Sequence, residues 1–445
     1  MTRHGEGVEI VVRSSGSHAP APQTIEGRPL MAWRDEARAT LSLPSGPVFA
    51  TGHQSECWHG GILAKSLWVQ AIARRERAHA VHVVVDQDGF DGMPLEWPFR
   101  RPDGWWGVRG HRFAAAAETR AAFACPAFRP RSVDAGEGVD ARMATAVQAI
   151  HDALLVHADA SSAAVQGAHA MLDLAGTWLE RPVMVRASDL MRTSLARRLL
   201  ERMLEDPEAC ARHFNASLRH APRAARALHV RGPDSELPVW LLGADGTRIR
   251  AGARELAGAL ARGATILPRA FLMSAVARTA LADRFTHGLG GGVYEQATDH
   301  WIRAWLGWSL PPHDVVSASL RMELPMPQEP TRGAMPWRRA WCDPDLIESG
   351  GTGPSAARRR ALDLIAAVPP RDPRRRAAFR ELVSERNTGR LRRSGELDAL
   401  RGAEEAAGAA RLARELAARR TWCFTLLDPR RITALRDALE ARAED

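Results

Sequence analysis

Short apolar runs that end in glycine or acidic residues define the pattern of the first hundred residues. An apolar run at 47–50 leads into the polar sequence T-G-H-Q at 51–54, and an amphipathic stretch follows over 62–75. The next run, 80–85, is rich in valine and ends at Asp86. A continuous valine-rich run is typical of a buried parallel strand. The pattern therefore predicts a strand, a glycine loop, a helix and a second parallel strand, which together form a βαβ unit of an α/β fold.

Helical and strand patterns alternate less regularly in the rest of the chain. Residues 139–223 are mostly helical in pattern and form a predicted helical insertion, with a further strand near 181–187. Asp245-Gly246 is flanked by apolar runs, which indicates a hairpin over 237–250. The remaining predicted elements are a helix within 266–281 that begins after Pro268, a helix over 294–306 and strands over 315–322 and 422–427.

The two ends of the chain differ in composition from the middle. Residues 1–46 are polar with several prolines and glycines, and we expect an N-terminal extension with one short helix. The core is predicted over 47–345. Residues 355–420 are dominated by Ala, Arg, Leu and Glu, which favours an arm of long amphipathic helices, as a helical hairpin or a coiled coil, that joins two copies into a homodimer. The terminal segment 421–445 is expected to pack back on the core.

Composition narrows the class of protein. The 445 residues are 45% hydrophobic and 25% charged, which is a globular composition. We expect no membrane association and no secretory signal, because neither an apolar run of about 18 residues nor an N-terminal apolar segment is present. Five scattered cysteines without a C-x-x-C pair fit reduced thiols in a cytoplasmic protein. The net charge of +9 is small for this length and its charges are interleaved, so small-molecule partners are favoured over nucleic acid.

Lysine and tyrosine each occur once, as Lys65 and Tyr294, against 60 arginines. Arginine replaces lysine wherever only positive charge matters, but not where a compact, titratable ammonium is needed. Phe or Trp replaces tyrosine as a packing group but not as a hydroxyl donor. Both residues are therefore candidates for functional positions, unless they are chance leftovers of a coding bias. A single lysine also excludes a P-loop, because G-x-x-x-x-G-K-[ST] is absent.

The first candidate constellation is T-G-H-Q-S-E-C-W-H-G-G at 51–61, followed by Lys65. A glycine loop before a helix N-terminus favours binding of a phosphate or carboxylate. His53 is predicted to move protons and Lys65 to contribute a charge. The predicted substrate-binding residues of this segment are Gly52, Gln54, Gly60 and Gly61.

Other interpretations of this segment stay open. The glycines would also fit a purely structural turn. His53, Cys57 and His59 are metal-ligand types, but their spacing matches no standard signature, and no metal site is predicted. Cys57 is either a nucleophile near a helix N-terminus or a buried, inert thiol beside Trp58.

Asp86 and Asp88, at the end of the valine-rich strand, form the second constellation. Carboxylates at the carboxyl edge of a parallel sheet can bind an ammonium, a ribose or a metal, or act as a base. The alternative is that they cap the loop.

The third constellation is H-G-L-G-G-G-V-Y-E-Q-A-T-D at 287–299. It combines a glycine cradle with a histidine and the single tyrosine before a helix. His287 and Tyr294 are predicted to be catalytic. The predicted substrate-binding residues here are Gly288, Gly290, Gly291, Gly292 and Asp299.

At these residues the chain resembles the bacillithiol biosynthesis cysteine-adding enzymes. Their Thr-Gly-Gln-Gln loop and following lysine correspond to 51–65, with His53 in place of the first Gln. Their acidic loop after a strand corresponds loosely to V-V-V-D-Q-D-G-F-D at 83–91. Three later motifs occur here in the family's order, as L-P-R-A-F-L at 267–272, G-L-G-G-G-V-Y at 288–294 and S-A-S-L-R at 317–321.

The resemblance implies a Rossmann-like core related to nucleotidyltransferases, with helical insertions and a C-terminal coiled-coil arm. It adds Arg269 to the substrate-binding residues and implies a ligase that joins a cysteine-like amino acid to an amine of a small polar acceptor. Whether a nucleotide is a cofactor is left open. The alternatives are a nucleotidyl or adenylyl transferase, with Gly52-His53 as half of a His-x-Gly-His signature, and a non-catalytic binding or scaffold protein.

Overall fold

The computed structural model describes residues 2–3, 8–14, 22–269, 271–325, 335–348 and 356–444. Parts of the predicted extension (4–7 and 15–21), Ala270 of the L-P-R-A-F-L motif, Ser355 of the predicted arm and Asp445 lie outside the described residues. Contacts between residues divide the chain into two units. The first consists of Met1–Pro102, Gly107–Glu323 and Arg419–Asp445, and the second of Asp103–Trp106 and Leu324–Ala418.

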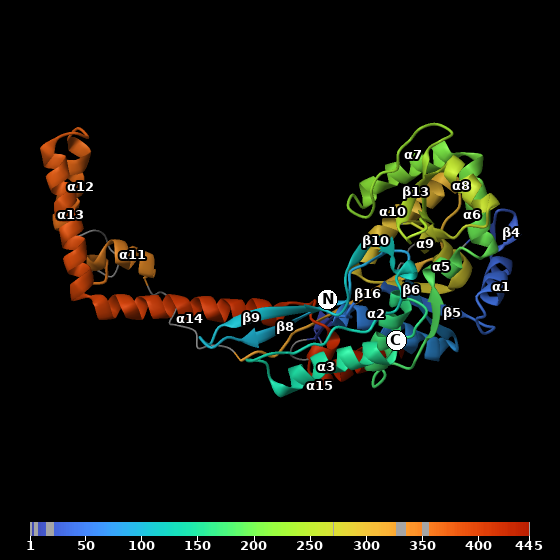
Figure 1. Ribbon diagram of the computed structural model, residues 1–445, viewed down its shortest axis with the longest axis horizontal. Coiled ribbons are helices and arrows are strands. Elements are labelled where there is room, and N and C mark those ends of the chain that lie inside the picture. The colour runs from blue at the N-terminus through green and yellow to red at the C-terminus, as the bar shows by residue number, and fades with distance from the viewer. Residues whose placement is uncertain are drawn as a thin grey trace. The chain divides into compact units, whose positions relative to one another are not determined.

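A mostly parallel sheet organises the first unit, as the valine-rich pattern predicts (Figure 1). Its strand order is β1-β2-β16-β15-β5-β6-β11, in which β16 to β11 are parallel neighbours and β2 runs antiparallel to β16. The parallel strands are β5 (Val48–Gln54), β6 (His79–Val85), β11 (Val183–Arg186), β15 (Arg284–His287) and β16 (His313–Leu320). The edge strands are β2 (Val8–Ser14) and β1 (Thr2–Arg3), so part of the predicted N-terminal extension belongs to the sheet.

Helices connect these strands. Helix α2 begins where the His59 ring accepts a hydrogen bond from the Gly61 N–H, and it ends at Arg77 in the left-handed conformation. The helices of this unit are α1 (Leu30–Thr40), α2 (Gly60–Glu76), α3 (Ala141–Val156), α4 (Ala163–Leu174), α5 (Ala187–Leu190), α6 (Ser194–Glu205), α7 (Pro207–Ser217), α8 (Ala253–Ala261), α9 (Phe271–Val276), α10 (Leu289–Leu306) and α15 (Pro429–Glu444). Among the described residues, no helix is both long and apolar enough to cross a bilayer.

The predicted hairpin at 237–250 is confirmed as β12 (Glu236–Leu242) and β13 (Arg248–Gly252), which join β14 (Ile266–Pro268) in a three-stranded sheet. Shorter pairs complete the unit: β3 (Thr24–Ile25) with β4 (Arg28–Pro29), β7 (Gly89–Phe90) with β10 (Ala117–Ala121), and β8 (Pro94–Arg100) with β9 (Trp106–Arg112).

The strand predicted at 422–427 is wrong. Only one bridge forms there, between His59 and Cys423, and Phe424–Leu426 is a 3-10 turn. The apolar side chains of this segment are buried, so packing against the core, rather than strand pairing, explains their hydrophobicity.

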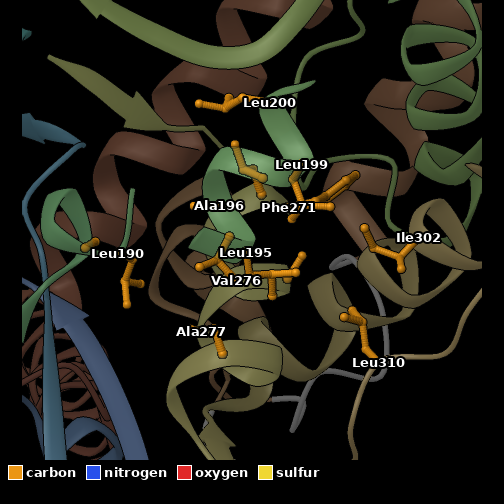
Figure 2. Close-up of a cluster of buried hydrophobic side chains, with 14 of the residues drawn as sticks. Leu190, Leu195, Ala196, Leu199, Leu200, Phe271, Val276, Ala277, Ile302 and Leu310 are labelled. Atoms are coloured by element: carbon orange, nitrogen blue, oxygen red, sulfur yellow. The ribbon is translucent and has the colours of Figure 1, made fainter. Parts of the chain in front are cut away.

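The main hydrophobic core lies against one face of the sheet. Val48, Ala50, Val81 and Val83 alternate along β5 and β6, and they belong to the same buried cluster as side chains of α1, α5, α6, α7, α9 and α10. Figure 2 shows the part of this cluster formed by Leu195 and Leu199 of α6, Phe271 and Val276 of α9, and Ile302 of α10. Helix α2 packs on β5, β6 and β16, and α15 packs on α2.

The second unit is predominantly helical. Its elements are α11 (Trp337–Cys342), α12 (Ala356–Ala367), α13 (Pro373–Arg392) and α14 (Ser394–Ala418). Helices α12 and α13 run side by side (Figure 1) around a small buried cluster of Ala361, Ile365 and Ala378, against which Leu382 packs. This pair is a helical hairpin, one of the two forms expected for the arm.

Candidate active site

A cleft of about 870 Å³ opens at the carboxyl ends of the central strands of the first unit. Parallel pairing of Ala50 with Phe285 and of Thr51 with Thr286 places the ends of β5 and β15 at the same level, so the loops that follow meet there. Both glycine-rich segments contribute to its walls. The predicted site residues that line it are Gly52, His53, Gln54, Gly61, Lys65, Asp88, Arg269, His287, Gly288, Gly290, Gly291 and Tyr294.

Lys65 extends from the second turn of α2 into this cleft. Its ammonium donates a 2.8 Å hydrogen bond to the Gly52 carbonyl, and the side chain is otherwise buried. Burial lowers the pKa of Lys65 to about 8, although the nearby Glu56 carboxylate opposes this shift. The ammonium is therefore mainly charged at neutral pH but loses its proton far more easily than a surface lysine.

His53 is held by its neighbours at the end of β5. Its Nδ1 accepts a hydrogen bond from the Gln54 N–H at 2.9 Å, and its Nε2 lies 3.0 Å from Glu56 Oε1. The Gln54 side chain donates to Asp88 at 3.0 Å. Burial and the charge of Lys65 lower the pKa of His53, so the ring is neutral at physiological pH.

His287 and Tyr294 also line the cleft. A Cβ atom at Gly291 would lie 2.9 Å from His287 Nδ1, so only a glycine leaves room for the ring here. Burial, and then the charges of Arg278 and Lys65, lower the pKa of His287 well below its usual value. The Tyr294 ring packs edge-on against Phe271 at 4.8 Å, and burial raises the pKa of its hydroxyl. Both groups are uncharged at neutral pH.

Asp86 does not line the cleft. Its carboxylate is buried and accepts hydrogen bonds from the backbone N–H and the hydroxyl of Ser188, at 2.9 and 2.5 Å. Asp86 thus ties the end of β6 to the start of α5. Burial raises its pKa to about 6, against the opposing effect of the Ser188 hydrogen bonds.

Three further predicted residues do not line this cleft. Gly60 packs against Leu320, where a Cβ atom would come within 2.5 Å of the leucine side chain. Gly292 and Asp299 line a second cleft of about 600 Å³, which shares only Leu289 with the first among the described residues. Asp299 accepts a 2.8 Å hydrogen bond from Arg278.

Five functional candidates were not found from the sequence. Arg248 and Arg250 of β13 line the cleft, and Trp240 of β12 lies between arginines, with the Arg269 and Arg248 guanidinium carbons 4.5 and 5.3 Å from its ring centroid. Arg226 comes from the irregular segment before β12. The spacing of two arginines at alternate positions of a predicted strand was an available signal for a basic strand face.

No pattern in the sequence marks Arg420 as a residue of the cleft. It belongs to the segment after α14, far from the other site residues in sequence. Its guanidinium donates to the Ser317 hydroxyl at 2.8 Å, beside the N-terminus of α2. Only the folded chain reveals its place in the cleft.

Positive charge therefore dominates the cleft. Six cations line it, whereas Asp88 is the one lining carboxylate in the part of the chain that the structure describes; the cations are Lys65, Arg226, Arg248, Arg250, Arg269 and Arg420. Glu236, which accepts a 2.5 Å hydrogen bond from Arg269, and Glu56 lie close behind this wall. Six cations against three carboxylates, together with two helix N-termini, favour an anionic ligand.

The residues considered for a metal have other roles. The His59 ring caps α2, and burial lowers its pKa to about 4. A hydrogen bond with the Cys423 thiol, together with burial, raises the pKa of Cys57, so this thiol is protonated and unsuited to nucleophilic attack. No group of three or more metal-ligating side chains comes together among the described residues.

No protein-family model matches the chain, and no curated protein is detectably similar to it in sequence.

The Asp86 carboxylate should make stability depend on pH. Its folded pKa of about 6 lies above the usual 3.8, so its stabilising contribution is complete below pH 4 and is lost as the pH rises through 6. Asp86→Asn should remove this loss, which we expect to be roughly 3 kcal/mol between pH 4 and 8. Denaturant unfolding across that pH range measures the free energy of unfolding. Asp88→Asn, the same exchange at a more exposed carboxylate of the same loop, is the control. A pH dependence that Asp86→Asn leaves unchanged would contradict this account.

Two adjacent glycines of α10 provide a matched pair of substitutions. Gly290→Ala meets no atom within 4 Å and should stabilise the helix by about 0.5–1 kcal/mol, whereas the Gly291→Ala methyl would collide with His287. We expect Gly291→Ala to lose ligand binding or activity at least tenfold while Gly290→Ala retains it. Thermal melting and binding are measured on both variants. Equal binding by the two would mean that the His287 ring position is unimportant.

Proposed function

We propose that this chain is an enzyme that forms a carbon–nitrogen bond, joining a cysteine-like amino acid to an amine of a small, anionic acceptor. The observation that carries the proposal is the convergence of Lys65, His287 and Tyr294 in one cleft with a cationic wall. The sole lysine and the sole tyrosine of the chain both lie in it. The bacillithiol cysteine-adding enzymes, which the motifs resemble, are the corresponding model for the reaction.

The order of the strands supports a Rossmann-like interpretation of the fold. Numbered along the chain, the five parallel strands lie in the order 3-2-1-4-5, with β5 first and at the centre. This is the order of Rossmann-type sheets, whose ligands bind where the chain switches sides. Here that switch lies between β5 and β15, where the cleft opens.

Each group has a role that its environment supports. The arginines of β13 and Arg420 would hold carboxylate or phosphate groups of the substrates. Lys65 would balance charge that develops on the reacting carboxyl group. Neutral His53 and His287 can accept protons, and the Tyr294 hydroxyl can donate a hydrogen bond.

Nucleotidyl transfer on the same fold is the second candidate, because the same cationic wall suits a polyphosphate. The absence of a second lysine weighs against it, since a mobile-loop lysine is common in such enzymes. A non-catalytic scaffold is less well supported, because it predicts that the two glycine segments lie apart, whereas both line one cleft.

The decisive experiment incubates the protein with cysteine and a set of amino-sugar acceptors that carry carboxylates, with and without ATP. Mass spectrometry then detects the products. An amide of cysteine and the acceptor supports the ligase. Release of pyrophosphate with a nucleotide adduct and no amide would instead identify a nucleotidyl transferase, and the absence of both would overturn the enzymatic proposal.

Lys65→Arg should weaken the binding of an anionic ligand by about 1–3 kcal/mol although the charge is kept. The guanidinium is larger, planar and unable to lose its proton, so it cannot reproduce the 2.8 Å bond to Gly52 in the same space. Citrate and ATP serve as probes in calorimetric titrations. Arg212→Lys, the reverse exchange on the surface of α7, is the control. Unchanged binding and melting of Lys65→Arg would mark this lysine as a leftover of coding bias.

We further propose that the arm of α12 to α14 joins two copies of the chain, as a coiled coil or a related helix pairing. Helices α12 and α13 pack on each other through Ala361, Ile365, Ala378 and Leu382. Four larger apolar side chains of the same helices stay exposed, namely Leu362, Phe379, Val383 and Leu391. Leu391 is 80% exposed. Apolar side chains gathered on a helix pair in this way favour a second copy as partner.

Replacement of Phe379, Val383 and Leu391 by glutamate should convert a dimer into a monomer, because it places charge in the proposed apolar contact. Sedimentation velocity at micromolar concentration measures the mass. The control is Arg380→Glu, which changes charge on the same helix without removing apolar surface. A wild-type protein that sediments as a monomer would rule out this dimer.

A further inference from the structure

Two buried polar atoms face each other behind the cleft. His287 Nε2 and Glu295 Oε1 lie 3.3 Å apart, and neither atom has a hydrogen-bond partner of good geometry among the described residues. The Glu295 side chain is fully buried and His287 is 9% exposed. Buried polar groups are almost always hydrogen-bonded, and an ionised carboxylate can only accept. A proton on Nε2 is therefore the placement that would let these two atoms satisfy each other.

Arg278 holds this carboxylate in place. It is buried, and its guanidinium donates to Glu295 Oε2 at 2.5 Å, to Asp299 at 2.8 Å and to the Pro311 carbonyl at 3.0 Å. An arginine does not lose its proton in a protein, so the two carboxylates that face it compensate its charge. A continuous line of contacts runs from Asp299 through Arg278 and Glu295 to His287.

This arrangement leaves Nδ1 of His287 without a proton. It lies beside Gly291, on the wall of the cleft. We propose that Glu295 is a positioning residue, which fixes His287 as the Nε2–H tautomer so that Nδ1 acts as the general base for an amine nucleophile bound in the cleft. The inference deepens the proposed ligase function and rests on it for the identity of the nucleophile.

Formation of the amide bond releases one proton from the amine. The amine nitrogen bonds to the carbonyl carbon of an activated carboxyl group of the acyl-phosphate or acyl-nucleotide class. The phosphate group leaves with the electron pair of the broken carbon–oxygen bond, and the proton of the nitrogen passes to Nδ1. The resulting imidazolium faces the Glu295 carboxylate, which stabilises it.

Four ionisable groups surround this ring. Glu295 of α10 is the negative one, with Arg278 beyond it; Lys65 approaches from α2, and the His313 ring of β16 lies 5.5 Å away, edge to face. Burial and the two cations keep the pKa of His287 low. An anion bound beside Lys65 would offset its charge and strengthen the base when substrate is present.

Glu295→Gln tests the assignment through the tautomer itself. Arg278 can only donate, so the amide oxygen of the variant must turn toward it and the amide NH₂ toward His287. Nε2 must then accept, and the proton moves to Nδ1, as in the serine-protease case in which an Asp→Asn exchange imposes the wrong tautomer. Nitrogen and carbon NMR of histidine-labelled full-length protein reports the tautomer, and His287→Gln identifies the signal.

The expected result is an Nε2–H ring in the wild type and an Nδ1–H ring in Glu295→Gln. Asp299→Asn, the same exchange at the other carboxylate of Arg278, should leave the tautomer unchanged. An Nδ1–H ring in the wild type, or a tautomer that Glu295→Gln does not alter in the folded protein, would overturn the proposal. If Glu295→Gln does not fold, the wild-type tautomer decides.

Activity separates this inference from the proposed function. If amide formation is detected, Glu295→Gln should lower turnover by 10²–10⁴-fold near neutral pH with little change in KM. Amide formation that is insensitive to Glu295→Gln would leave the ligase standing and remove the base. If the protein shows the predicted tautomers but makes no amide, the role of Glu295 in fixing the His287 tautomer stands and the proposed ligase function does not.

Discussion

The parallel pairing of β5 with β15 is the constraint on which the site depends. Thr51 and Thr286 are partners across it, and the Thr51 hydroxyl donates to the Thr286 carbonyl at 2.8 Å in the buried interior. Side chains separated by more than two hundred residues thereby reach the same edge of the sheet. A shift of this register by one residue would turn alternate side chains to the wrong face and separate the loops.

Cations crowded into one cleft oppose folding as well as favouring ligands. Mutual repulsion among six positive groups raises the free energy of the folded state, and Asp88, Glu56 and Glu236 offset only part of it. A bound anion would offset more of this repulsion, which would link ligand binding to stability. The buried line from Asp299 to His287 differs, because its charges are paired within the protein and do not await a ligand.

Local patterns predicted the parts of the fold that local physics controls. The valine-rich strand and the hairpin at Asp245-Gly246 follow from residue type and spacing, and the single Lys65 and Tyr294 pointed to the cleft. The glycine segments were expected as loops, but Gly52 lies in β5 and Gly290, Gly291 and Gly292 lie in the first turn of α10. Asp86 escaped this reasoning because its partner, Ser188, is 102 residues away. Burial and partner choice are properties of the assembled molecule, so Arg420 and Glu295 could not be recognised beforehand either.

The position of Arg420 has a consequence for how the protein is made. The chain leaves the first unit at Glu323, forms most of the second unit and returns at Arg419. A ribosome therefore synthesises the sheet, both glycine-rich segments and the entire arm before it adds Arg420, whose guanidinium contacts Ser317. During synthesis the nascent molecule carries an incomplete cleft, and α2 lacks the covering helix α15 until the return segment has emerged.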